Sequence, residues 1–385
     1  MTSTAPSVQV EFVERAAQLD EELWRACFPE PWEGLFWYRA LEESGLEDQF
    51  RFAYALIRQA GTPVGIAPCF VHDVPINLVA PPAVAFVLEQ IARIFPRIGY
   101  QRTLFIGSPC SEGGRIGLVP GVSLAGLIPA LRAAVCQRAE ELGAPMIVFK
   151  DFAETDQAAL GALAGFCPTV SYPGSVVVLS APGKDAYLVR LSHNQRHNLR
   201  KKLRRSAELL PLTTTVVSHP SDHELREILG LFQQTYERGR TKFERLGLRF
   251  FECIRGQPPA RFILQRDAAN GELVTFMLVF HLGGRVVNKF IGLDYRRGEK
   301  VFLYFRLFDA ALDWAYAAGA TELHSGQTGY RAKLDLGHRL VPLWNFFRHR
   351  NPLVHALFGA IGRRITWRSL DPDLAAHLAA HPDSH

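Results

Sequence analysis

Long apolar runs are missing from this 385-residue sequence, which contains no stretch of about 18 uncharged apolar residues. A helix that spans a bilayer needs such a stretch, so the sequence predicts no spanning segment. The longest candidate, residues 74–88, contains Pro75, Pro81 and Pro82, which would break a spanning helix, and we interpret it as a buried or interfacial segment. Because residues 1–10 have no basic flank before an apolar core, we expect no secretory signal and a cytoplasmic location.

Closely spaced metal ligands are also missing. The six cysteines lie far apart, without a Cys-x-x-Cys pair, and none of the thirteen histidines falls in a His-Glu-x-x-His pattern. Zinc sites and redox-active thiol pairs depend on such spacings. The sequence therefore predicts reduced thiols and no bound metal.

Composition and charge indicate a folded chain with two unlike halves. Hydrophobic residues make up 48% and charged residues 21%, which is a normal globular balance, and the length favours two cores. Residues 1–180 contain 12 Lys and Arg against 19 Asp and Glu, a net charge of −7, whereas residues 181–385 contain 31 against 19, a net charge of +12. We expect the second half to meet an anionic partner.

The same order of elements is predicted in both halves. The first half offers a hairpin, a strand, a glycine-rich loop, a long helix and a strand, over residues 50–72, 102–106, 107–121, 124–142 and 146–150. The second half offers a helix at 222–238 with Ser221 as its N-cap, then an antiparallel meander of three strands. The meander and the elements after it cover residues 261–266, 273–281, 285–293, 303–318, 321–324, 329–336 and 339–347.

This order predicts an α+β fold. Antiparallel strands that lead into a strand, helix, strand crossover imply a mixed sheet with helices on both faces. We place two tandem domains at residues 1–180 and 181–350. An amphipathic helix and a polar tail follow at residues 351–385.

Three segments of the second half carry a family resemblance. They are Leu191-Ser192 with Arg196 and Arg200, the KFIGLDY run at residues 289–295, and the SGQTGYRAK run at residues 325–333. Together with the repeated element order, they resemble the Gcn5-related N-acetyltransferase (GNAT) superfamily, in its FemAB-like and CelD-like branch with tandem GNAT domains. The resemblance covers most of residues 10–350 and implies an acyltransferase.

The resemblance also implies a thioester as acyl donor: a coenzyme A thioester (acyl-CoA) as co-substrate, or an acyl carrier protein thioester. Ordinary GNAT enzymes hold the pyrophosphate of coenzyme A in an Arg/Gln-x-x-Gly-x-Gly/Ala loop. Residues 296–301 read RRGEKV at the equivalent place, without the second small residue, yet their cationic groups and backbone amides suit phosphate. The cofactor-binding candidates are Arg296, Arg297, Gly298, Lys300 and Tyr304.

Three residues are candidates for the chemistry, because acyl transfer to an amine needs a proton donor and a base. The superfamily often uses a tyrosine near the start of the helix after the fifth strand, and Tyr330 matches that position. His324 and Asp294 end neighbouring parallel strands, so either could act as the base. The alternatives are packing for the tyrosine and strand-end capping for the other two.

Further polar residues are predicted to bind substrate. Ser325, Gln327 and Lys333 share the polar turn and could orient the acyl carbonyl, or simply form the turn. A charged and aromatic segment after the helix at 222–238 is a candidate to close over the substrate, or a solvated helix end. Its members are Arg240, Lys242, Phe243 and Glu244.

Two basic features suggest anionic surfaces. Arg196, Arg200 and Arg204 repeat every four residues on one helical stripe, which suits phosphates of lipid, coenzyme or RNA, or is a solvated face. The absence of interleaved aromatics there weighs against a platform for single-stranded nucleic acid.

The second basic feature lies near the C-terminus. Residues 353–365 form an apolar helical stripe, and Arg363 and Arg364 are among the arginines that flank it. This pattern is typical of a helix lying on an anionic membrane, or of one docked on its own core.

Three functions follow from these features. The leading hypothesis is transfer of an acyl group from a thioester to a long-chain amine, specifically a sphingoid base to give a ceramide, by a protein peripheral to the inner face of the membrane. The first alternative is aminoacyl transfer onto a cell-wall precursor, as in Fem proteins, and it alone involves tRNA. The second alternative is a non-catalytic binding protein with the same fold. None of the three involves DNA.

Overall fold

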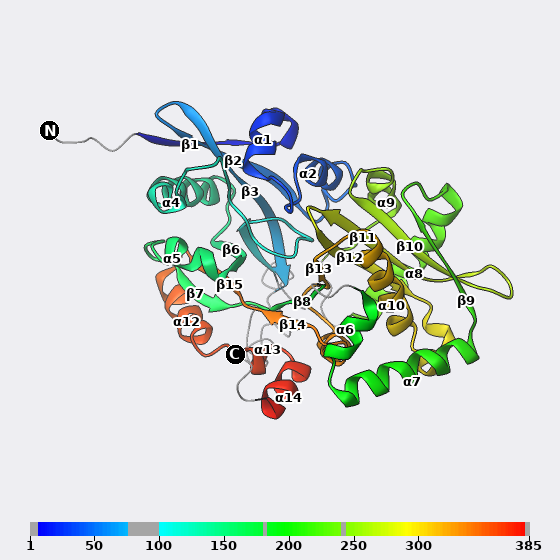
Figure 1. The fold of residues 1–385 in the computed structure, drawn as a ribbon. Coiled ribbons are helices and arrows are strands. Elements are labelled where there is room, and N and C mark those ends of the chain that lie inside the picture. Colours follow the sequence, from blue (N-terminus) through cyan, green and yellow to red (C-terminus); the bar gives the residue numbers. More distant parts are fainter. Residues whose placement is uncertain (1–6, 76–99, 180–182, 240–243, 382–385) are drawn as a thin grey trace, which may run out of the picture.

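The computed structural model describes residues 7–75, 100–179, 183–239 and 244–381, and its strands form two mixed sheets (Figure 1). The predicted segments at 76–88 and 240–243 lie outside the described residues. The first sheet has the order β1 (Val8–Val13), β2 (Arg51–Gln59), β3 (Thr62–Pro75), β4 (Tyr100–Ile106), β6 (Met146–Ala153), β15 (Leu343–His349), β7 (Cys167–Val170), and β5 (Gly117–Leu118) pairs with β3. The second has the order β14 (Arg339–Val341), β8 (Gly174–Val178), β13 (Glu322–His324), β12 (Arg285–Leu293), β11 (Leu273–Leu282), β10 (Ala260–Asp267), β9 (Leu212–Val217).

Helices cover the faces of both sheets, as the α+β prediction requires. α4 packs on the first sheet, while α8 and α9 pack on one face of the second sheet and α7 and α10 on the other. The helices are α1 (Glu21–Cys27), α2 (Leu35–Glu42), α4 (Leu124–Glu141), α5 (Gln157–Leu160), α6 (Lys184–Arg190), α7 (His193–Leu209), α8 (Asp222–Arg238), α9 (Leu248–Ile254), α10 (Leu303–Ala317), α11 (Tyr330–Asp335), α12 (Pro352–Gly362), α13 (Trp367–Leu370) and α14 (Pro372–Ala380).

Local signals explain the elements that match the predicted order. Ser221 caps α8 by accepting from the Glu224 backbone amide, and the Glu224 side chain bonds back to Ser221, which completes a capping box. The hairpin of β2 and β3 turns at Ala60 and Gly61, whose φ angles are 50° and 84°. Such left-handed angles suit a tight hairpin turn.

The two halves exchange strands, which the sequence did not predict. β8 precedes residue 180 but lies in the second sheet, and β15 follows the second half but lies in the first sheet, between β6 and β7. The single last strand expected at residues 339–347 is therefore wrong. Pro342 divides it, because proline has no N–H to continue a ladder, and the chain passes there from β14 in one sheet to β15 in the other. The division at residue 180 does not follow the sheets.

Each sheet contains a parallel pair of strands among its antiparallel ones. In the second sheet β12 pairs with β13 over only three residue pairs, from Arg285 with Glu322 to Val287 with His324. β12 then continues to Leu293, whereas the chain leaves β13 at Ser325. The two strands therefore diverge beyond the third pair.

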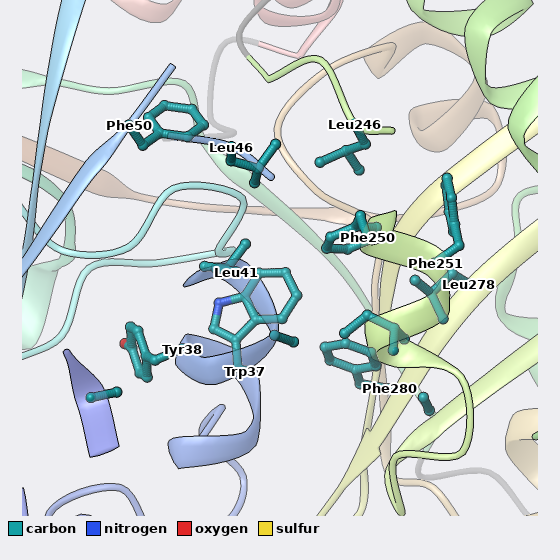
Figure 2. Packing of buried hydrophobic residues seen from close by; sticks show 14 of the residues in the cluster. Trp37, Tyr38, Leu41, Leu46, Phe50, Leu246, Phe250, Phe251, Leu278 and Phe280 are labelled. Carbon is teal, nitrogen blue, oxygen red and sulfur yellow. The ribbon is translucent and has the colours of Figure 1, made fainter. Parts of the chain in front are cut away.

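A shared aromatic core joins the two halves (Figure 2). Trp37 on α2 is fully buried, and its ring centroid lies 6.1 Å from that of Phe250 on α9 and 5.5 Å from that of Phe280 on β11. Its indole N–H donates to Ser108 Oγ at 3.1 Å. One hydrophobic cluster thus contains residues of both halves, so their relative position is set by burial rather than by a linker.

We predict that Trp37→Ala destabilises the protein by about 3–5 kcal/mol, because it leaves a large cavity between the halves. Urea unfolding followed by circular dichroism measures this change. Leu209→Ala, at a half-exposed position on α7, is the matched control and should change stability by about 0.5 kcal/mol or less. Equal losses of stability in the two variants would contradict a special contribution of Trp37 to the packing of the two halves.

Candidate functional site

A cavity of about 890 Å³ opens where β12 and β13 diverge, and residues of both halves line it. The second half contributes Asn288 to Ile291 on one side and Ser325 to Gly329 on the other, so the predicted crevice between the two strand ends is present. The first half contributes one face of its sheet and the loop after β4. Three lysines and three acids line the cavity: Lys150, Lys289, Lys333, Glu112, Asp151 and Glu244.

A β-bulge turns Lys289 toward the first half. The register of β11 and β12 shifts between Leu278 and Val279, opposite Phe290 and Asn288, so Lys289 is the extra residue. Its ammonium donates to Glu33 Oε1 at 2.9 Å and to the Cys110 carbonyl at 2.6 Å. The side chain is almost fully buried, so this pair holds the loop of the first half against β12.

The glycine-rich loop of the first half closes the gap beyond β4 and β6. Gly114 donates to the Asp151 carbonyl at 2.7 Å and bridges to Phe152. A Cβ at Gly114 would lie 2.0 Å from the Lys150 carbonyl oxygen, so no larger residue fits. The closed loop places Ser111 and Glu112 on the wall of the cavity in the second half.

Glu112 and Lys333 both approach Gly326 on the wall of the crevice. Glu112 Oε1 and Lys333 Nζ lie 3.4 Å and 3.8 Å from the point that a Cβ on Gly326 would occupy. Lys333 is 5% exposed, and burial lowers its pKa to about 8, although the Glu112 charge opposes this shift. Within the described part of the chain, no ion pair joins either side chain to another residue. Lys333 therefore carries a proton near pH 7 that it releases readily.

His338 holds Ser325 beside Lys333. Its Nδ1 lies 2.8 Å from the Lys333 carbonyl, which can only accept, so Nδ1 carries the proton and Nε2 accepts from Ser325 Oγ at 2.9 Å. Burial and the Lys333 charge lower the pKa of His338 to about 3. Such a weak base orients the Ser325 hydroxyl rather than activating it as a nucleophile.

A second polar cluster lies on the first sheet. Asp151 has a left-handed φ of 60°, pairs with Lys150, accepts from the Ser171 hydroxyl, and donates its backbone N–H to Asn345 Oδ1 at 2.7 Å. Burial lowers the pKa of Lys150, but Asp151 outweighs it and the net shift is upward, so the lysine is charged. Burial raises the pKa of Glu244, which faces the same space.

Three buried polar atoms on the cavity wall have no hydrogen-bond partner among the described residues. They are Ser111 Oγ, Asn288 Oδ1 and the Tyr304 hydroxyl. Buried polar groups are normally paired, so a wall with three free ones is suited to a polar ligand. The chemistry of the cavity thus combines a carboxylate, an ammonium and unpaired donors and acceptors.

Comparison with known proteins identifies the family. The model of the FemAB-like family, described as peptidoglycan biosynthesis/recognition, matches residues 15–360. The chain belongs to the FemAB-like family. No protein of curated function matches it.

Solved structures similar to this FemAB-like chain share its fold at low sequence identity. FemX is 14% identical with a TM-score of 0.57, over 91% of this chain and 100% of FemX. A conserved protein of unknown function from Bacteroides thetaiotaomicron is 13% identical with a TM-score of 0.51, over 88% and 99% of the two chains. A tandem GNAT protein from the clavulanic acid biosynthesis pathway is 13% identical with a TM-score of 0.50, over 89% and 99%. The predicted two-domain GNAT-like fold is confirmed.

The family and the fold together make the chain an acyl- or aminoacyltransferase. Of the predicted substrate-binding residues, Ser325, Gln327, Lys333 and Glu244 line the cavity. The Gln327 amide donates to the Tyr172 carbonyl at 3.0 Å, which fixes the polar turn to the first half. The remaining three, Arg240, Lys242 and Phe243, lie outside the described residues.

The three residues predicted for the chemistry of this FemAB-like chain do not line the cavity. Tyr330 is fully buried and donates to the Pro173 carbonyl at 2.8 Å, and burial raises its pKa. His324 Nε2 contacts Glu322 at 2.9 Å, and burial lowers its pKa despite that partner. Asp294 is fully buried beneath two arginines, Arg296 and Arg297. Packing and pairing occupy all three, so the geometry brings Lys333 and Glu112 to the crevice in their place.

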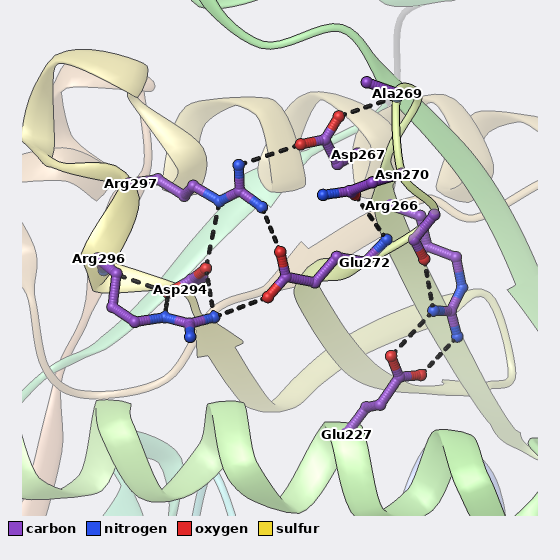
Figure 3. A network of polar contacts seen from close by, with 10 residues as sticks. Glu227, Arg266, Asp267, Ala269, Asn270, Glu272, Asp294, Arg296 and Arg297 are labelled. Carbon is purple, nitrogen blue, oxygen red and sulfur yellow. Dashed lines mark hydrogen bonds and ion pairs between the residues drawn. The ribbon is translucent and has the colours of Figure 1, made fainter.

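The two arginines of the predicted phosphate-binding loop, residues 296–301, form ion pairs with nearby carboxylates (Figure 3). Arg296 pairs with Asp294 and Glu272, and Arg297 pairs with Asp294, Glu272 and Asp267. Burial alone would raise the pKa of Asp294, but the arginines hold it below its ordinary value. Two guanidinium groups facing three carboxylates leave no surplus positive charge for a pyrophosphate. Of the five cofactor candidates, Tyr304 lines the cavity, while Lys300 is exposed and Gly298 has a φ of 80°.

The basic features lie on the surface. Arg200 and Arg204 are exposed on α7, whereas Arg196 bonds the carbonyls that end α6. Arg363 and Arg364 are exposed after α12, whose inner face docks on the protein. Every helix in the described ranges is too short or too polar to cross a bilayer. In the same ranges, no three of His, Cys, Asp and Glu gather as metal ligands would.

Sequence reasoning missed the contribution of the first half. Glu112 stands in a glycine-rich loop whose pattern is too common to single out, and its neighbour Lys333 is more than 200 positions away. Lys150 and Asp151 end a predicted strand, in the position that His324 and Ser325 occupy in the second half. Applying the strand-end argument to both halves would have identified Lys150 and Asp151 as candidate site residues.

The depressed pKa of Lys333 predicts a pH-dependent stability. In the unfolded chain a lysine keeps its proton up to a pKa of about 10.4, so between pH 8 and 10.4 the unfolded state binds more protons. The free energy of unfolding should therefore gain up to about 1.4 kcal/mol per pH unit across this window from Lys333. Lys333→Met should remove the gain, and Lys300→Met, at an exposed lysine, should keep it. Urea unfolding from pH 7 to 10 measures this; parallel curves for wild type and Lys333→Met would refute the assignment.

Proposed function

We propose that the chain joins an aminoacyl group to an amine of a cell-wall precursor, with the reaction at the crevice between β12 and β13. The observation that carries this proposal is the approach of both Glu112 and Lys333 to Gly326, on the wall of the cavity. A carboxylate from one half and an ammonium from the other supply the base and the positive charge that amine acylation needs.

The two side chains have complementary roles. The acceptor amine attacks the carbonyl carbon of the donor, and Glu112 takes a proton from the amine nitrogen. The Lys333 ammonium stabilises the negative charge that forms on the carbonyl oxygen. The bond to the leaving oxygen then breaks, and the leaving group receives the proton from Glu112. Ser325 Oγ donates its proton to His338, so it can accept a hydrogen bond from the attacking amine.

The choice of aminoacyl-tRNA as donor follows from the charges around residues 296–301 and on α7. The loop that would hold the pyrophosphate of coenzyme A has its arginines paired to three carboxylates, which disfavours a coenzyme A donor. The resemblance to Fem proteins implies aminoacyl-tRNA, and the exposed Arg200 and Arg204 on α7 offer positive charge for its phosphates. The family description supports a cell-wall acceptor, and the sphingoid base predicted from sequence has no counterpart in the comparisons.

A donor and acceptor panel tests the proposal. Purified protein is mixed with aminoacyl-tRNA or acyl-CoA, and with a cell-wall precursor peptide or a long-chain amine, and products are identified by mass spectrometry. We expect product from aminoacyl-tRNA and the precursor peptide, and ribonuclease should abolish it. Product from acyl-CoA that survives ribonuclease would overturn the aminoacyl donor and leave acyl transfer in place.

Substitution of Glu112 and of Lys333 tests their roles. Glu112→Gln should lower kcat by about 10²–10⁴-fold, and Lys333→Met by about 10²–10³-fold, with little change in circular dichroism. In wild type kcat should decline above pH 8, as Lys333 loses its proton. Glu154→Gln, at an exposed carboxylate, is the matched control and should keep wild-type kcat. A Glu112→Gln variant with wild-type kcat would exclude Glu112 as the base.

Charge reversal on α7 tests donor binding. Arg200→Glu and Arg204→Glu should each weaken tRNA binding and reduce the slope of log K against log salt by about one. Arg226→Glu on α8, which packs on the opposite face of the second sheet, is the control and should leave the slope unchanged. Filter binding or fluorescence anisotropy at several salt concentrations gives the slopes. An unchanged slope in both α7 variants would show that tRNA does not bind at Arg200 and Arg204.

A further inference from the structure

One end of the cavity is apolar, and the change from polar to apolar follows the strands of the first sheet. On β6, alternate residues line the cavity in the order Lys150, Val148, Met146, and on β15 Phe347 lines it beside Val148. Strands rise about 3.3 Å per residue, so the wall runs about 13 Å from Lys150 to Met146. We call the space along this wall the apolar arm.

α12 and the turn after it form the opposite wall of the apolar arm. Phe358, Ile361 and Ile365 line the cavity at helical spacing. Two buried glycines let the helix approach the sheet closely: a Cβ on Gly359 would lie 3.0 Å from Cys167 Sγ, and one on Gly362 would lie 3.0 Å from Phe347. The helix predicted to lie on a membrane therefore docks on the protein by its inner face, while Leu353 and Leu357 point outward, 80% and 55% exposed.

The apolar arm provides burial without hydrogen bonds. The hydroxyls of Thr103 on β4 and Thr169 on β7, which line the cavity, already donate to the Gln101 and Gly362 carbonyls. In addition, five of the arm's apolar side chains belong to none of the three hydrophobic cores formed by the described residues. These are Met146, Phe347, Phe358, Ile361 and Ile365.

We propose that the apolar arm binds a long hydrocarbon chain carried by one of the two substrates. This inference rests on the proposed function, because it takes the reacting groups to lie at the polar centre beside Glu112 and Lys333. A chain that starts at this centre and runs along Val148 and Met146 gains burial with each methylene. The chemistry that the arm recognises is an unbranched or prenyl-like apolar chain, on either the donor or the acceptor.

Chain-length series test the arm and identify the source of the chain. One series varies the acyl chain of the donor with a short acceptor, and the other varies the acceptor chain with a short donor. Affinity should rise by up to about fourfold per methylene until the arm is full, in the series whose chain occupies the arm. Chain-length independence in both series would overturn the inference.

Ile361→Trp should fill the arm. We expect it to shift the preferred chain in that series to a shorter length, with turnover of the shortest substrate retained. Leu357→Trp, one turn earlier on α12 and facing away from the cavity, is the matched control and should leave the preference unchanged. An equal shift in both variants would place the effect outside the arm.

Direct binding separates this inference from the proposed function. A fluorescent long-chain alcohol, which carries no charge, should bind wild type and Leu357→Trp alike, and should bind Ile361→Trp at least about tenfold more weakly. Ile361→Ala, which enlarges the arm, keeps the comparison interpretable if the tryptophan variant does not fold, and should favour longer chains. Probe binding without transfer to any acceptor would refute the proposed function alone, whereas transfer without probe binding would refute the arm.

Discussion

The functional site depends on the short pairing between strands β12 and β13. β12 and β13 share three residue pairs and then part, because β12 continues beside β11 to Leu293 while the chain after His324 turns through Gly326. Parallel strands that diverge expose their side chains and backbone groups to a common space, and ligands gather at such points in mixed sheets. The bulge at Lys289 and the turn that leads to Lys333 both follow from this separation.

The two halves share one arrangement of strands, but it has a different role in each half. Each has a parallel pair followed by a divergence, but in the first half Gly114 fills the gap and bonds to Asp151 on β6. The loop that closes this gap contributes Ser111 and Glu112 to the opening in the second half. The tandem architecture therefore builds one cavity from two related units, with the aromatic cluster around Trp37 holding them in register.

Features set by local signals could be predicted from the sequence, whereas contacts between distant segments mostly could not. Capping at Ser221 and the turn at Gly61 act within a few residues, so the elements they bound were predictable. Ser325, Gln327 and Lys333 were found because one turn contains all three. Two partners of Arg296 and Arg297 come from β10 and the β10–β11 turn, and the third is the residue after β12, so their ion pairs could not be read from the RRGEKV run. Pro342 was visible, and its effect on the last strand could have been anticipated.

The position of β15 has a consequence for how the protein is made. Strands β6 and β7 have no ladder with each other and are joined only through β15, which the ribosome delivers after residue 342. Until then β6 presents an open edge of the kind that pairs with other chains. The first half cannot mature while the second is still being translated, which departs from the usual domain-by-domain order. A nascent chain of this kind needs protection for nearly the whole of its synthesis.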